Sequence, residues 1–421
     1  MLVNLFAWLD QYAGDFPGAR LFQYLTFRAG LAVILSLLIS LVFGGTIIAY
    51  LRRQQIGESV RDLGLQGQVQ KQGTPTMGGV IIILAILIPT LLVGRLDNVY
   101  LQLLILATVW MGIIGFLDDY IKVFRKDKQG LKGKFKIAGQ VGLGLMIALV
   151  MLGHRSFVVR MDTEEAVALG LDDRDRVGDF IYTPTSQGIT EKADYRTAIT
   201  NVPFVKGNQL NYGLLLPGFL QGGNAWAWLV FVPVVLFIVT GVSNAANLTD
   251  GLDGLATGVS GIIALALGIF AYVSGNAIAA NYLNILHLPG SGELLIFTGA
   301  LLGACLGFLW YNSFPAQVFM GDTGSLTLGG ILAALAIVLR KELLLPVLCG
   351  VFLVESLSVI LQVAYFKYSR RKYGEGRRIF LMSPIHHHFQ KKGIHEVKIV
   401  TRFWLVGVLL AVFTLITLKI R

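Results

Sequence analysis

The sequence predicts an all-α polytopic membrane protein with about ten transmembrane helices. Its 421 residues are 55% hydrophobic and 14% charged, and the mean hydropathy is +0.68. A soluble globular domain carries roughly a quarter charged residues, so this composition excludes that class. Two further observations support the prediction: the apolar residues form runs of membrane-spanning length, and Lys and Arg are concentrated in alternate connections.

Ten apolar segments are long enough, or nearly long enough, to cross a bilayer as helices, for which about 20 residues are needed. They cover 28–50, 77–94, 101–117, 137–153, 226–243, 255–274, 294–310, 326–339, 343–366 and 403–418. We therefore expect one integral membrane domain, 1–421. The polar connection 154–225 is expected to form a small lobe inserted within it, without catalytic residues.

The distribution of Lys and Arg predicts the orientation. The connections 51–76, 118–136 and 367–402 contain four, seven and ten basic residues, which is 21 of the 35 in the chain. Basic residues are enriched in cytoplasmic loops, so we expect this face to be cytoplasmic, with both termini and the lobe outside. Orientation and anionic lipid or phosphate partners explain the net charge of +10, and we expect no nucleic acid as a partner.

Several polar stretches fall on the predicted cytoplasmic face. Asp118 and Asp119 end one apolar segment, Asp322 lies between glycines after another, and three histidines occupy 386–388. A carboxylate pair at this depth costs several kcal/mol unless charge or metal compensates it. We therefore expect one shared site, although an Asp between glycines is also typical of a simple turn.

A polar stripe occupies the next cytoplasmic stretch. Asn244, Asn247, Asp250 and Asp253 recur every third residue, which lines them along one face if the helix continues. Such a face could bind a ligand, and capping or turn chemistry is the alternative explanation.

Basic residues near these carboxylates have two explanations each. Lys71 precedes a Gly-rich turn that suits a phosphate, or it is a solvated loop lysine. Lys122 lies one turn from Asp118, and a simple ion pair at a helix end is the alternative to phosphate binding.

The ninth apolar segment and the histidine run complete the candidate site. Glu355 and Gln362 are seven residues apart and share a helix face, for ligand binding or for helix packing. Consecutive histidines diverge by about 100° on a helix, so phosphate contact or proton transfer explains the run better than a zinc site.

Taken together, these motifs resemble those of the polyprenyl-phosphate N-acetylhexosamine-1-phosphate transferases, and the histidine run resembles their muramoyl-pentapeptide branch. The matching stretches are TPTMGG at 74–79, FLDDY at 116–120, NLTDGLDG at 247–254, FMGD at 319–322 and PIHHHF at 384–389. The resemblance covers the chain except the lobe, which is longer than the outer loop expected of that family.

The resemblance implies transfer of phospho-MurNAc-pentapeptide from UDP-MurNAc-pentapeptide to undecaprenyl phosphate, giving lipid I and UMP with Mg²⁺. It also implies roles for individual residues. Asp322 would hold Mg²⁺, Asp118 would deprotonate or position the lipid phosphate with support from Asp119, and His386 would take part in catalysis. The implied substrate-binding residues are Lys71, Thr76, Lys122, Lys134, Asn247, Asp250, Asp253, Asn312, Phe319, Gln362, His387 and His388.

Two alternatives remain at this level. One is a sibling transferase using UDP-GlcNAc, which the histidine run disfavours, and the other is a lipid or ion transporter, which does not account for the acidic residues beside glycine turns. The resemblance implies the bacterial cytoplasmic (inner) membrane. A homodimer is compatible with the sequence.

Overall fold

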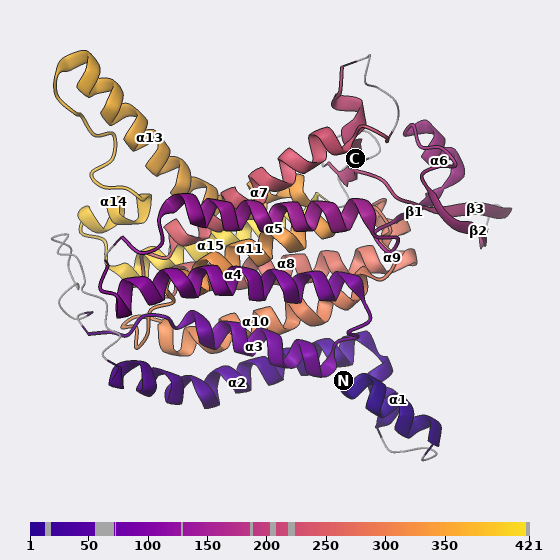
Figure 1. Ribbon diagram of the computed structural model, residues 1–421, viewed down its shortest axis with the longest axis horizontal. Helices are drawn as coiled ribbons and strands as arrows, with labels where there is room; N and C mark the ends of the chain where they lie inside the picture. Colours follow the sequence, from indigo (N-terminus) through magenta and orange to yellow (C-terminus); the bar gives the residue numbers. More distant parts are fainter. Residues whose placement is uncertain are drawn as a thin grey trace.

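The protein is a bundle of long, roughly parallel helices with a small β-containing lobe at one end (Figure 1). The computed structural model describes residues 1–12, 18–54, 71, 73–127, 129–185, 188–202, 208–217 and 224–417. The bundle helices are α2 (Leu25–Arg53), α3 (Gly79–Val93), α4 (Val99–Phe124), α5 (Gly133–Gly153), α7 (Trp228–Thr249), α8 (Leu255–Gly275), α10 (Leu294–Asn312), α11 (Gly321–Val338), α13 (Gly350–Tyr373) and α15 (Glu396–Ile416).

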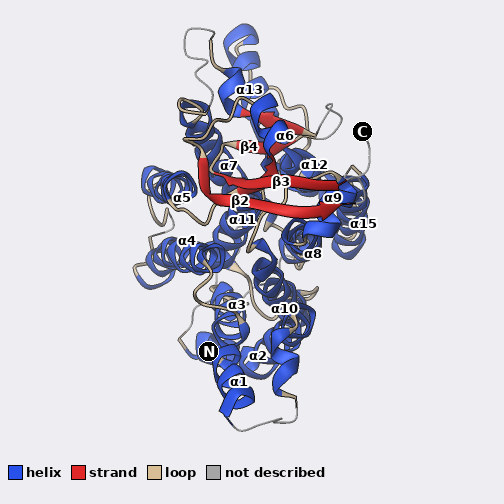
Figure 2. Cartoon of the chain, turned by 90° about the vertical axis from the view of Figure 1, so that its right-hand side faces the viewer, coloured by secondary structure: helices blue, strands red, loops and turns tan. Residues whose placement is uncertain are grey.

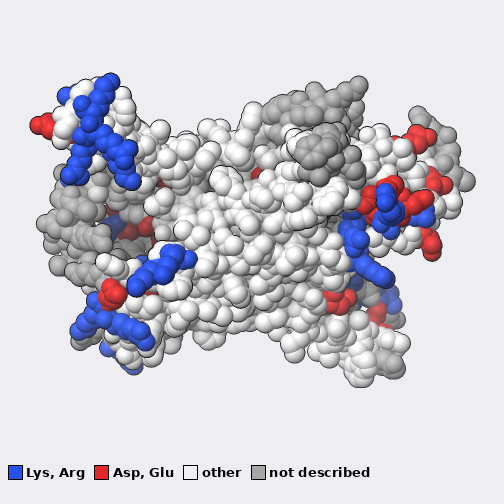
Figure 3. Space-filling view, turned by 45° about the horizontal axis from the view of Figure 1, so that its top comes forward, with Lys and Arg blue, Asp and Glu red and all other residues white. Residues whose placement is uncertain are grey.

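These ten helices coincide with the ten predicted apolar segments. Within the described residues, nine have the length and hydropathy to span a membrane, and the shorter Gly79–Val93 is equally apolar. The all-α polytopic prediction is therefore confirmed. Charged side chains gather at the two ends of the molecule and leave an uncharged surface between them (Figure 3), as a bilayer requires.

Three boundaries differ from the predicted ones in ways that affect the site. Helix α4 continues to Phe124, so Asp118 and Asp119 lie inside a helix rather than after it. Helix α7 ends at Thr249, so the predicted stripe does not run along one continuous helix. Residues 343–349 belong to a 3₁₀ turn and the short helix α12 (Leu345–Leu348) before α13 begins.

The lobe lies across one end of the bundle, which we call the lobe end (Figure 2). Its strands form an antiparallel three-stranded sheet in the order β1-β3-β2 and a separate β4-β5 pair. The lobe elements are β1 (Val159–Asp162), α6 (Thr163–Ala168), β2 (Arg176–Thr185), β3 (Gly188–Tyr195), β4 (Ile199–Asn201) and β5 (Gln209–Asn211). Two further short helices, α1 (Leu2–Tyr12) and α9 (Ala277–Leu283), lie at the same end, while α14 (Ile385–Lys391) lies at the opposite end.

Helix α11 is the centre of the bundle. Every residue from Thr323 to Val338 is buried, and the helix packs against α3, α4, α7 and α8. At the lobe end, the Arg340 carbonyl accepts hydrogen bonds from the Asn201 amide at 3.0 Å and the Thr200 hydroxyl at 3.1 Å. The turn that follows α11 therefore anchors the lobe at one end, and the first turn of α11 carries Asp322 at the other.

Small residues allow the close helix contacts that hold the bundle together. Where α10 crosses α2, a Cβ added to Gly303 would lie 2.4 Å from the Val33 carbonyl oxygen. Lipid tails are as apolar as side chains, so helices in a bilayer associate through such close backbone packing rather than through hydrophobic burial.

Candidate active site

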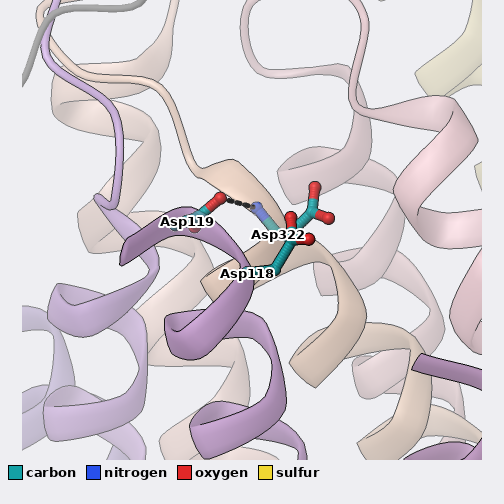
Figure 4. Close-up of side chains that lie close together, drawn as sticks. All are labelled: Asp118, Asp119 and Asp322. Atoms are coloured by element: carbon teal, nitrogen blue, oxygen red, sulfur yellow. Dashed lines mark hydrogen bonds between the residues drawn. The ribbon is translucent and has the colours of Figure 1, made fainter. Parts of the chain in front are cut away.

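Three carboxylates meet at the end of the bundle opposite the lobe, which we call the site end. Asp118 and Asp119 come from α4, and Asp322 comes from the first turn of α11. Each offers an oxygen atom within 4.8 Å of the others (Figure 4). A glycine makes this approach possible, because a Cβ at Gly115 would lie 2.3 Å from the Asp322 carbonyl oxygen.

Two lysines bridge Asp118 and Asp322. The Lys136 Nζ lies 2.9 Å from Asp118 Oδ1 and 2.5 Å from Asp322 Oδ2. The Lys122 Nζ lies 2.5 Å from Asp118 Oδ2 and 3.2 Å from Asp322 Oδ2. Asp118 is fully buried, so these ammonium groups supply the compensating charge that a buried carboxylate needs.

Asp119 has a different environment from Asp118. Its Oδ1 accepts a hydrogen bond from the Asp322 amide at 3.1 Å, the bond drawn in Figure 4. Its Oδ2 accepts from the Thr323 amide at 2.8 Å and the Thr323 hydroxyl at 2.6 Å. These are amides of the first turn of α11, so Asp119 caps that helix from a neighbouring helix and holds Asp322 in place.

The polar residues of α7 divide between different partners. The Asn247 Nδ2 donates to Asp322 Oδ1 at 2.9 Å, whereas the Asn244 Nδ2 donates to Gln140 Oε1 at 2.9 Å, deeper in the bundle. Asp250 is the half-buried residue after the last turn of α7. The structure thus brings Asn247 to the acidic cluster and leaves Asn244 in helix packing.

A second ionic group lies at the same end of the bundle. The Lys71 Nζ lies 2.7 Å from Asp253 Oδ1 and 2.6 Å from Glu396 Oε1. The Asp253 backbone amide also donates to Glu396 Oε1 at 2.7 Å. Lys71 is therefore paired with carboxylates in this structure, and Glu396 belongs to a group that the sequence motifs did not indicate.

The loop between α10 and α11 is held from inside. The buried Asn312 side chain accepts from the Gly254 amide at 3.1 Å and donates to the Val318 carbonyl at 2.9 Å. The Phe319 amide donates to the Pro75 carbonyl at 2.8 Å, and Thr76 is buried beside Gly321. These contacts bring the 74–79 motif to the start of α11, with Asn312 serving as an internal brace.

The histidines are presented by α14. His386 is fully buried, and its Nδ1 lies 3.0 Å from Oε2 of the equally buried Glu355. The Nδ1 of His387 lies 2.7 Å from Gln390 Oε1. Burial, with smaller contributions from His386 and Lys71, lowers the pKa of His387 to about 4, so this side chain is neutral at ordinary pH.

His388 and Gln362 organise the loop before α14. The Nδ1 of His388 accepts from the Leu381 amide at 3.1 Å, and burial lowers its pKa as well. Gln362 accepts from the Ile379 and Phe380 amides at 3.0 Å and donates to the Phe380 carbonyl at 3.1 Å. The amide group of Gln362 is therefore engaged with backbone in this structure.

One basic residue occupies a different place from the one that the resemblance implied. Lys134 is exposed, with its Nζ 5.2 Å from the centre of the Phe135 ring, while Lys136 enters the acidic cluster. The two residues lie about 200° apart on α5, so only one can face the cluster. The missed residues are thus Lys136 and Glu396, which lie among other basic and polar residues and carried no distinguishing sequence signal, whereas Glu355 was already a candidate as a carboxylate within an apolar segment.

The carboxylate set fits a hard divalent cation. Mg²⁺ takes oxygen ligands and is usually bound through one or two carboxylates plus substrate phosphates and water. Asp118 and Asp322 offer such oxygens with cationic groups already between them, so this position favours positive charge. Asp119 is less available, because both of its oxygens accept hydrogen bonds from α11.

Comparison with known proteins defines the class first. The profile described as "Glycosyl transferase family 4" matches residues 196–340, and "Phospho-N-acetylmuramoyl-pentapeptide-transferase signature 1" matches residues 71–83. With the helical bundle, these matches define a polytopic membrane glycosyl transferase.

Full-length relatives then define the family. The chain is 56% identical over 421 residues to a protein of Flavobacterium psychrophilum and 54% identical over 435 residues to one of Parabacteroides distasonis. A third relative, from Amoebophilus asiaticus, is 50% identical over 421 residues. All three are named phospho-N-acetylmuramoyl-pentapeptide-transferase, and 100% of each chain is covered, lobe included. This chain belongs to the phospho-N-acetylmuramoyl-pentapeptide-transferase family.

Proposed function

We propose that this protein transfers phospho-MurNAc-pentapeptide from UDP-MurNAc-pentapeptide to undecaprenyl phosphate, producing lipid I and UMP. The observation that carries the proposal is 50–56% identity to transferases of that name along the entire chain. The buried acidic cluster, with Lys122 and Lys136 paired to its carboxylates, supports the proposal. Carboxylates can hold a metal ion and lysines can bind phosphate oxygens, and a reaction between two phosphate groups needs both.

In the proposed reaction an oxygen of the lipid phosphate attacks the β-phosphorus of the nucleotide. The bond between that phosphorus and the bridging oxygen breaks, and UMP leaves. Asp118 orients the acceptor phosphate or takes its remaining proton, which demands little base strength because the second pKa of a phosphate monoester is about 6. When substrate binds, Lys122 and Lys136 would leave their carboxylate partners and contact phosphate oxygens instead. Their positive charges would then offset the negative charge of the phosphate groups.

Mg²⁺ is part of the proposal, with Asp322 as its principal ligand and Asp118 as the second. When bound, the ion would neutralise diphosphate charge and polarise the phosphoryl oxygens. Asp119 would then act by holding the first turn of α11, which fixes the position of Asp322.

The nucleotide and the sugar are assigned to the groups around the cluster. Asn247 donates a hydrogen bond to Asp322, and Lys71 forms an ion pair with Asp253 at the same end of the bundle, so we assign these residues to the nucleotide-sugar bound at the cluster. Neutral His387 can accept a hydrogen bond from a substrate hydroxyl or amide. The remaining assigned contacts are Thr76, Asp250, Phe319 and His388, with Lys136 in the position that the resemblance gave to Lys134. Asn312 and Gln362 would support these contacts by bracing the loops around the site. His386 keeps the catalytic role that the resemblance implies.

We further propose that the protein lies in the bacterial inner membrane with the site end in the cytoplasm and the lobe and both termini outside. The lysine and arginine distribution supports this orientation. A homodimer is included in the proposal, and the mass of the purified particle would test it.

Release of UMP by the purified protein tests the proposed activity. With Mg²⁺ and undecaprenyl phosphate, UDP-MurNAc-pentapeptide should support turnover and UDP-GlcNAc should not, and chelation should abolish the reaction. The variant Asp118→Asn should be inactive, while Asp172→Asn, an exposed lobe position, serves as the matched control. Turnover with UDP-GlcNAc alone would assign the sibling activity, and no turnover with either nucleotide would contradict a transferase.

A test without lipid acceptor separates the two possible routes. In a single displacement, enzyme with Mg²⁺ and UDP-MurNAc-pentapeptide releases no UMP until undecaprenyl phosphate is added. A burst of one UMP per active site, with label retained on Asp118 or Asp322, would establish a covalent intermediate instead.

A further inference from the structure

A polar cavity of about 630 Å³ opens at the lobe end of the bundle, away from the acidic cluster. It lies between the start of α2, the α3–α4 connection, the α5–β1 connection and the α8–α10 connection. Tyr100 lines it near the start of α4, whereas Asp118 lies 18 residues further along the same helix. At 1.5 Å per residue the two sites are roughly 27 Å apart.

A buried ion pair lines the inner part of this cavity. Arg28 is 2% exposed, and its two terminal nitrogens donate to the Glu293 carboxylate at 2.8 and 2.6 Å. The third nitrogen, Nε, is buried without a hydrogen-bond partner among the described residues. An N–H group of a buried cation left without an acceptor costs free energy, so the cavity offers a place for an acceptor to bind.

Some of the remaining charged side chains of the cavity already have ion-pair partners, and others have none or only a distant one. Asp194 is held by Arg160 through bonds of 2.7 and 2.9 Å. Arg95 and Arg155 are exposed, and Arg95 is only weakly paired, with its Nε 3.9 Å from Glu293. Neither Arg155 nor the exposed Asp97 has a side-chain hydrogen bond or ion pair within the described part of the chain. The available groups are therefore two guanidinium groups and one carboxylate.

The cavity lies next to exposed apolar residues at the end of a spanning helix. Leu21, Tyr24 and Phe27 are exposed and apolar, and they are near neighbours along the chain of the cavity-lining residues at the start of α2. At this depth a headgroup can enter the polar cavity while its acyl chains remain against the apolar surface. A free phosphate compound would gain nothing from these apolar neighbours.

We propose that this cavity binds the headgroup of a zwitterionic aminophospholipid. The phosphodiester lies against Arg95 and Arg155, because guanidinium groups bind phosphate oxygens with paired hydrogen bonds, and the Arg28 Nε supplies a further donor. The lipid ammonium group lies against Asp97. The site is a structural lipid site, independent of the transfer reaction.

Native mass spectrometry of the full-length protein in detergent tests this assignment. The protein is titrated with 1-palmitoyl-2-oleoyl phosphatidylethanolamine, with the corresponding phosphatidylglycerol, and with soluble phosphoethanolamine. We expect one tightly retained phosphatidylethanolamine per chain, and at least tenfold weaker binding of the other two compounds. The double variant Arg95→Gln, Arg155→Gln should weaken phosphatidylethanolamine binding at least tenfold. Asp97→Asn should reduce the preference over phosphatidylglycerol to less than twofold.

Arg174→Gln is the matched control, because Arg174 is an exposed lobe arginine outside the cavity. It should leave lipid retention unchanged, and in detergent without added lipid all these variants should keep the thermal stability of the lipid-free wild-type protein. The proposal is overturned if the wild-type protein retains no phosphatidylethanolamine, if it retains phosphatidylglycerol equally well, or if the double variant binds like the control. Equal binding of soluble phosphoethanolamine would assign the cavity to a free phosphate compound and would also overturn it.

Discussion

The substitution Asp119→Asn tests whether this carboxylate acts by capping α11 or by reacting with substrate. In the wild-type protein its two oxygens accept three hydrogen bonds, from the Asp322 amide and from the amide and hydroxyl of Thr323. Asparagine has one acceptor oxygen and one NH₂ group, which cannot accept. At least one backbone N–H of the first turn therefore loses its partner.

The expected cost follows from these contacts. An unsatisfied N–H in a buried position costs about 1–3 kcal/mol, and loss of a negative charge at a helix N-terminus costs about 0.3–1 kcal/mol. We therefore expect Asp119→Asn to lower the free energy of unfolding by about 1–4 kcal/mol, together with a loss of activity. Thermal unfolding in detergent and UMP release measure the two effects on the same preparation.

Asp322→Asn is the comparison variant. The cap bond involves the backbone amide of Asp322 rather than its carboxylate, so this variant keeps the cap while losing the proposed metal ligand. We expect it to be inactive and to lose less stability than Asp119→Asn, because the backbone cap bonds remain and Lys122 and Lys136 keep Asp118 as a partner. If Asp119→Asn instead loses activity with unchanged stability, Asp119 takes part in the chemistry directly and the capping argument is refuted.

Three further predictions follow from the same contacts. Lys136→Met should lower kcat/KM for UMP release about 10- to 150-fold, because it removes a charge-assisted contact with Asp118 and Asp322. Lys134→Met, the control at an exposed position, should lower kcat/KM less than threefold. Equal losses in the two variants would count against the placement of Lys136 in the cluster. Gln362→Ala should expose the loop before α14, so that trypsin cleaves at Arg377 about tenfold faster, and unchanged cleavage would show that the amide does not hold the loop. The pKa of His387 is lowered from 6.5 to about 4. Between these two pH values His387 is neutral in the folded protein and protonated in the unfolded chain, so the free energy of unfolding should fall as the pH drops from 6.5 to about 4. In His387→Gln, the loss of free energy of unfolding on going from neutral to acid pH should be smaller than in the wild type by about 2 kcal/mol, a value that allows for partial exposure. Thermal unfolding against pH measures this loss, and identical profiles for the variant and the wild type would contradict the lowered pKa.

The helices and the end of the bundle that carries the site could be predicted from the sequence. Both depend on the hydropathy of each segment and on the number of Lys and Arg residues in each connection, and neither depends on which helices pack together. Apolar runs identify membrane spans regardless of which helices are neighbours. Asp118, Asp119 and Asp322 could be grouped because they follow apolar segments on the same predicted face. The motif at 74–79 could be joined to them only through the resemblance, and its pairing with Phe319 required the structure.

The sequence by itself thus indicated the membrane-spanning fold, the three carboxylates of the acidic cluster and, through its motifs, the family. Only the tertiary structure decided what each charged side chain contacts. Lys134 and Lys136 are chemically identical, and the rotation of α5 against α4 places only Lys136 between Asp118 and Asp322. Likewise, Asp119 is a neighbour of Asp118 along the chain, but it points to the first turn of α11, some 200 residues away. Contacts of this kind depend on helix rotation and packing distance, which are set by the whole bundle rather than by any local stretch of sequence.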